Sequence, residues 1–85
     1  MITYEQKLAA ALESYQAGRY REAEAQCLDM VQKEPGQPEV LHLLGVILYQ
    51  AGRFDDAVER LQMAVRASPE NDRYRLSLGA VWISM

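Results

Sequence analysis

One stretch of this 85-residue chain occurs twice, and the distance between its two copies restricts the fold more than any other feature. Residues 15–35 and 49–69 share eight of 21 positions without a gap, including a glycine at Gly18 and Gly52. Each shared position lies 34 residues from its copy. A fixed period of this length is typical of stacked structural repeats, in which one unit alone is too small to bury its apolar face. We therefore expect a repeat architecture.

The residues at the ends of each repeat segment indicate helices. Thr3, with Gln6 three residues later, predicts a capping box at the start of the first helix. Gly18 and Gly52 each follow a run of helix-forming residues, where a residue in the left-handed conformation would end a helix. No stretch shows the two-residue alternation of a strand. The predicted helices lie near residues 3–16, 20–33, 38–50, 54–67 and 72–84.

Composition and charge exclude several classes of protein. The net charge of −3 argues against nucleic acid or an anionic membrane as a partner. A single cysteine, Cys27, excludes an internal disulfide and indicates a reducing compartment. Residues 1–7 lack the apolar core of a signal peptide, and the longest apolar run, 40–49, is too short to span a bilayer. We therefore expect a cytoplasmic protein.

The second repeat unit, residues 38–71, resembles the tetratricopeptide repeat family, whose unit also has 34 residues. The residues that carry the resemblance are Leu41, Leu44, Gly45, Leu48, Gly52, Phe54, Ala57, Leu61, Ala64 and Pro69. Unit 4–37 matches the pattern less closely, and 72–85 matches only its first helix. The resemblance implies an all-α fold of antiparallel helix-turn-helix repeats, five helices stacked as a short right-handed solenoid. The whole chain, 1–85, would form a single domain.

Packing explains most of the recurring residues. The aromatic residue after each turn glycine, Tyr20 or Phe54, is expected to wedge between the two helices of its repeat. Ala23 and Ala57 then allow the two backbones to approach closely. Helix 38–50 is apolar almost all round, which predicts burial on several sides.

The resemblance also implies a concave groove, lined by the first helix of each repeat, that binds a segment of a partner protein or peptide. Carried over position by position, the groove residues are Leu8, Leu12, Tyr15, Gln16, His42, Val46, Tyr49, Gln50, Arg73, Leu76 and Ile83. One subset of the family grips a C-terminal carboxylate with Lys and Asn side chains. Of the corresponding positions here, only Arg73 carries the required charge, so a clamp of that kind is not expected.

No residue pattern indicates catalysis. His42 is the only histidine and has no cysteine pair or second histidine at metal-ligand spacing. The glycines do not form a phosphate-binding loop. We therefore expect no enzyme activity, no metal and no cofactor.

Two alternatives to a simple binding module remain open. The chain could be the N-terminal part of a larger enzyme, such as a transferase, or a self-assembling scaffold. The sequence stops at Met85, where a second helix of the third repeat is expected, and this favours one of the two.

The last predicted helix carries more apolar side chains than one inward face can hold. We therefore expect a homodimer or larger homo-oligomer through residues 72–85. The candidate contact residues are Leu76, Val81, Ile83 and Met85.

Overall fold

The computed structural model describes all 85 residues and contains five α-helices and no strand. The helices are α1 (Tyr4–Gln16), α2 (Tyr20–Lys33), α3 (Pro38–Gln50), α4 (Phe54–Ala67) and α5 (Asp72–Ser84). The all-α prediction is therefore confirmed, and each helix begins and ends within one residue of the predicted boundary.

The start of α1 is fixed by the predicted capping box. The hydroxyl of Thr3 accepts a hydrogen bond from the Gln6 backbone N–H at 3.2 Å. The Gln6 side-chain oxygen accepts one in return from the Thr3 backbone N–H at 2.9 Å. Two amide groups that the first turn of a helix leaves unpaired thereby gain partners.

The turns inside the two repeats have the same geometry. Gly18 and Gly52 have φ angles of +81° and +79°, which a residue with a side chain rarely adopts. After each glycine an arginine N–H donates back into the preceding helix. Arg19 bonds the carbonyl of Ser14 and Arg53 that of Leu48, both at 2.9 Å. The sequence repeats because the same bend is built twice.

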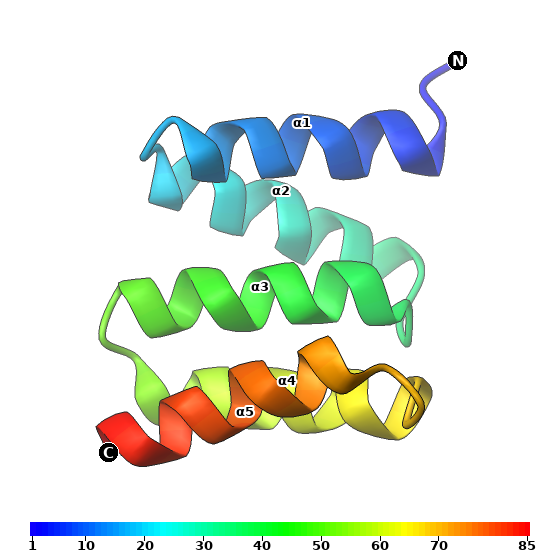
Figure 1. Cartoon of the computed structure of the whole chain (residues 1–85). Helices are drawn as coiled ribbons and strands as arrows, with labels where there is room; N and C mark the ends of the chain where they lie inside the picture. Colours follow the sequence, from blue (N-terminus) through cyan, green and yellow to red (C-terminus); the bar gives the residue numbers. More distant parts are fainter.

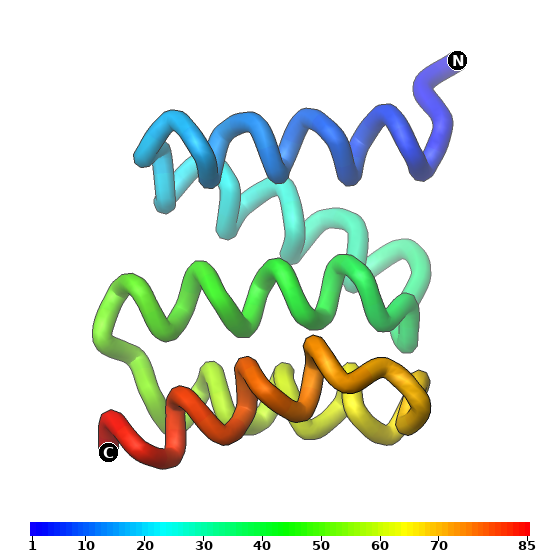
Figure 2. Tube along the Cα trace, in the orientation of Figure 1, coloured from blue at the N-terminus to red at the C-terminus, as the bar shows by residue number.

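The five helices form two layers (Figures 1 and 2). Helices α1, α3 and α5 run in the same direction in one layer, and α2 and α4 lie behind them. The principal extents of the molecule are 40, 27 and 18 Å. Helix α3 lies at the centre of the stack and packs against each of the other four helices.

The central position of α3 explains its composition. Seven of its 13 residues are buried, which confirms the prediction that several of its sides are covered. Most of the core is one cluster that runs from Ala11 in α1 to Val81 in α5. A smaller cluster joins Leu41 of α3 and Ala64 of α4 to Tyr74 of α5.

Helix α4 lies directly against the backbone of α3 at Gly45. A Cβ atom added at Gly45 would lie 2.6 Å from Cγ of Leu61, and Leu61 itself is completely buried. One period later, Gly79 of α5 has no atom within 4 Å of the same added Cβ. The two glycines occupy the same repeat position, but only Gly45 is required by packing within the chain.

Two sequence-based expectations need correction. Tyr20 does not wedge between α1 and α2, because it is 39% exposed and its ring instead lies against Tyr15, with the ring centroids 5.6 Å apart. Val81 was expected at an oligomer contact, but it is only 1% exposed and belongs to the core. It faces inward because it stands one period after Ile47, which is also buried.

The two helical glycines give opposite predictions for substitution by alanine. Gly79→Ala should stabilise the fold by about 0.5–1 kcal/mol, because alanine loses less backbone entropy in a helix and its methyl group meets open space. Gly45→Ala should instead destabilise it by up to about 2.5 kcal/mol, because the cost of overpacking against Leu61, about 1–3 kcal/mol, exceeds the same gain in helix propensity. Urea unfolding of dilute protein measures both values. Equal shifts in the same direction would contradict the α3–α4 contact described above.

Candidate partner-binding groove

One cavity of about 310 Å³ is lined by the three helices of the first layer. Side chains from all three helices line it: Leu8, Leu12 and Tyr15 of α1, Glu39, His42, Leu43 and Val46 of α3, and Arg73 and Tyr74 of α5. Six of the nine are hydrophobic. Below, this cavity is called the groove.

The apolar part of the groove lies between α1 and α3. Leu8 and Leu12 project from α1 because they are four residues apart and share one face of the helix. Val46 lines the α3 side of the cavity. Leu12 remains 42% exposed, so nothing within the chain covers its outer surface. This part of the groove can accept an apolar side chain of a ligand.

The polar part of the groove is centred on His42. Its Nε2 atom lies 2.7 Å from the hydroxyl oxygen of Ser77 in α5, and its ring lies against the ring of Tyr74, with the centroids 4.8 Å apart. Burial of the imidazole, with a smaller contribution from the positive charge of Arg73, lowers the pKa of His42 below its ordinary value of 6.5. His42 is therefore neutral at pH 7, and its contact with Ser77 joins α3 to α5.

Charged side chains also border the groove. Glu39 of α3 and Arg73 of α5 both line it, and neither forms an ion pair within the chain. Their charges are therefore available to a ligand that lies along the groove.

The structure brings together six of the eleven predicted groove residues, namely Leu8, Leu12, Tyr15, His42, Val46 and Arg73. The other five, Gln16, Tyr49, Gln50, Leu76 and Ile83, do not line this cavity. The ring of Tyr49 packs against Phe54, and its hydroxyl lies 3.0 Å from that of Ser84. Leu76 and Ile83 are 73% and 87% exposed.

Tyr74 was missed as a groove residue by sequence reasoning. It stands one period after Val40, a core residue, and is itself only 5% exposed. A valine at this position ends within the core, whereas the longer tyrosine side chain extends to the groove and meets His42. In the sequence, only the size of the Tyr74 side chain indicated that it could reach the groove.

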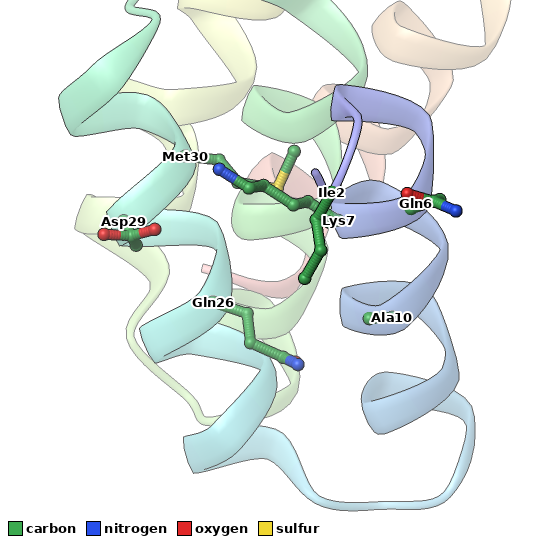
Figure 3. Close-up of a pocket in the computed structure, with 7 residues that line it drawn as sticks. All are labelled: Ile2, Gln6, Lys7, Ala10, Gln26, Asp29 and Met30. Carbon is green, nitrogen blue, oxygen red and sulfur yellow. The ribbon is translucent and has the colours of Figure 1, made fainter.

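A second cavity, of about 490 Å³, lies between α1 and α2 (Figure 3). It contains none of the predicted groove residues, and four of the seven residues that line it are polar. In Figure 3 the Lys7 side chain reaches from α1 towards α2, where Gln26, Asp29 and Met30 line the other wall. This cavity shares no lining residue with the groove.

The remaining reactive groups do not form a site. No group of three or more His, Cys, Asp or Glu side chains is placed to hold a metal ion. Cys27 is fully buried, and burial raises the pKa of its thiol to about 12. None of the helices combines the length and the apolar character needed to cross a membrane.

Antiparallel helix pairs that stack on one another and form a groove along one layer are typical of a helical-repeat protein. The sequence model of the tetratricopeptide repeat matches residues 14–80, and the chain belongs to the tetratricopeptide repeat family. Among solved structures, a mutant of the O-GlcNAc transferase of Thermobaculum terrenum is similar to it, with a TM-score of 0.88 and 30% sequence identity. The match covers 95% of this chain but only 16% of that transferase chain.

The lowered pKa of His42 predicts a pH-dependent stability. Because the unfolded chain binds a proton more readily than the folded one, the free energy of unfolding should fall as the pH drops below 6.5. In His42→Gln this contribution should be absent, so stability should depend less on pH between pH 7.5 and 5.5. Urea unfolding at both pH values measures the difference. An equal loss of stability in both proteins would contradict the assignment of a neutral, buried imidazole.

Proposed function

We propose that this chain binds a segment of a partner protein in the groove and carries out no chemistry of its own. The observation that carries this proposal is a cavity lined by all three helices of the first layer, with hydrophobic residues predominating. Ligand sites are commonly apolar cavities with a few polar groups that fix orientation. The tetratricopeptide repeat family generally mediates contacts between proteins, which supports the same conclusion.

The distribution of side chains defines the ligand segment further. An apolar side chain of the ligand would insert between α1 and α3, against Leu8, Leu12 and Val46. Polar groups beside it would meet Glu39 and Arg73, whose charges no other side chain neutralises. The apolar contact supplies most of the affinity and the charged contacts set the direction of the segment.

A second candidate is that the chain is the repeat region of a larger enzyme. The observation that favours it is the structural match to an O-GlcNAc transferase, of which this chain spans about one sixth. In that case the groove would present proteins to a catalytic domain elsewhere. Whether the reading frame of the gene continues past codon 85 discriminates between the two candidates.

The other elements of the proposal follow from the same features. Residues 1–85 are proposed to form one domain, with repeats 4–37 and 38–71 and a half repeat 72–85. A cytoplasmic location fits the single, reduced Cys27. Self-association through residues 72–85 is proposed as a property separate from the groove.

A pair of matched leucines tests the groove. The probe is a peptide selected from a random display library against the full chain, and its affinity is measured by fluorescence anisotropy. Leu12→Ala should weaken binding about tenfold, the loss of roughly 1–2 kcal/mol expected for an apolar anchor. Leu28→Ala is the control, because Leu28 is exposed to almost the same extent, 41% against 42%, but lies on α2 outside the groove. Equal effects of the two substitutions would overturn the proposal.

A further inference from the structure

Helix α5 contains a glycine that no contact within the chain requires. Gly79 lies inside the helix, where glycine is less favourable than alanine. Its φ angle is not positive, and a Cβ atom there would meet nothing within 4 Å. Gly45, one period earlier, lies against α4, because an added Cβ would be 2.6 Å from Cγ of Leu61 and 3.5 Å from the carbonyl oxygen of Ala57. Helix α5 therefore carries, at the same position, the residue that lets α4 approach α3.

The residues that flank Gly79 on the same side of α5 are exposed. Helix α5 is the outermost helix of its layer (Figure 1). Arg75 lies four residues before Gly79 and Trp82 three residues after it, so the three share one side of the helix. One period earlier, Leu41 and Leu48 are 0% and 3% exposed, whereas Trp82 is 52% exposed and the Arg75 side chain 49%. Below, the surface formed by Arg75, Gly79 and Trp82 is called the Gly79 face.

We propose that the Gly79 face binds an amphipathic helix of a partner protein, which packs against α5 as α4 packs against α3. The partner helix runs antiparallel to α5. It places a large aliphatic side chain on the bare backbone of Gly79, as Leu61 lies on Gly45. Four residues before that side chain it carries a small residue, as α4 carries Ala57 before Leu61, so that the two backbones can approach.

Charge defines the partner helix further. In the first helix pair of this kind, Leu41 of α3 and Ala64 of α4 belong to one core cluster. Arg75 stands one period after Leu41, so the partner residue at the position of Ala64 would lie beside a guanidinium group. Within the chain this group donates to Asp72 and to the carbonyl oxygen of Pro69, which leaves other N–H groups to donate. An acidic residue three positions after the large aliphatic one would complement it.

A second copy of this chain has no free helix with this pattern. In α4 the pattern consists of Ala57, Leu61 and Ala64, and all three are fully buried. The corresponding residues of α2 are also buried, namely Ala23, Cys27 and Met30. The occupant that fits the Gly79 face is therefore a helix of a different protein.

The Gly79 face is separate from the other surfaces described above. None of its three residues lines the groove, so the inference does not depend on the function proposed for the groove. The exposed residues proposed for self-association, Leu76, Ile83 and Met85, also lie outside it.

Trp82 can report the binding directly, because it is the only tryptophan of the chain. The probe is a synthetic peptide with the sequence of residues 53–68, which contains no tryptophan, and with the substitution Ala64→Glu. When the peptide is added to the full chain, the fluorescence of Trp82 should shift to shorter wavelength, because the partner helix covers the indole. The helical circular dichroism of the mixture should exceed the sum of the two separate spectra, since so short a peptide is only marginally helical alone.

Matched substitutions test the contact at each position. Gly79→Leu should raise the dissociation constant about tenfold or more, because the new side chain occupies the place of the aliphatic side chain of the partner. Ala80→Leu is the control, since it adds the same side chain outside the Gly79 face and should leave binding unchanged. In the peptide, Leu61→Ala should weaken binding by about the same factor. A peptide with Ala64→Lys should bind about threefold more weakly than the Ala64→Glu peptide, and Arg75→Gln in the chain should remove this difference.

Several results would overturn the proposal. One is the absence of a fluorescence shift at about 1 mM peptide. Another is a shift that Gly79→Leu leaves intact, because the peptide would then bind elsewhere. A shift that appears when the chain alone is concentrated, and that Gly79→Leu removes, would assign the Gly79 face to a second copy. A gene that encodes a helix of this pattern directly after codon 85 would assign it to the chain itself.

Two further controls keep the outcomes distinct. Leu12→Ala, which tests the groove, should leave the Trp82 shift unchanged, so that failure of the groove proposal and failure of this one can be told apart. Equal binding of the Ala64→Glu and Ala64→Lys peptides would overturn the acidic character assigned to the partner. Circular dichroism verifies that each variant chain is folded.

Discussion

The contact between Leu61 of α4 and the bare backbone of Gly45 in α3 sets the position of the other helices. Leu61 is fully buried there and cannot turn towards solvent. Because α3 packs against all four other helices, any change in its distance from α4 is transmitted to both ends of the stack. A close-packed interior resists such a change, since its side chains have few voids into which to relax.

The groove is a consequence of that arrangement. The side of α3 that faces α4 uses its residues for packing, and the opposite flank leaves His42 and Val46 between α1 and α5. His42 would be an unfavourable residue to bury without a partner, but the Ser77 hydroxyl lies 2.7 Å from its Nε2 atom. The polar side of the groove therefore also links two successive repeats. Contact between a ligand and His42 would therefore depend on the distance between α3 and α5.

The positions of the helices could be predicted from the sequence because local chemistry determines them. The capping pair at Thr3 and the glycines at Gly18 and Gly52 act within a few residues of the chain, and all three are where they were expected. Val81 was wrongly assigned to an oligomer contact, although the 34-residue period places it at the position of Ile47, which is apolar. That assignment followed from the number of apolar residues in the last helix and not from the repeat register.

The groove was only partly predictable, because side-chain reach depends on how the helices pack. The repeat register identified the α1 residues Leu8 and Leu12, since their direction follows from helix geometry alone. Whether Tyr74 enters the groove depends on the length of its side chain and on the distance between α3 and α5. The same distance decides that Tyr49 meets Ser84 and Phe54 and does not line the groove. Contacts of this kind can be identified only when the distances between the packed helices are known.

The two ends of the stack differ in a way that bears on what each can bind. On α1 the exposed residues Gln6, Ala9 and Glu13 are polar or small, as solvent contact requires, and Leu12 is 42% exposed on the side of the groove. The α5 end exposes Leu76 and Ile83 instead. A helix that faces water permanently gains nothing from apolar residues around a central glycine, and it loses helix stability at that glycine. The outermost helix at the α5 end therefore exposes larger apolar side chains than the outermost helix at the α1 end does.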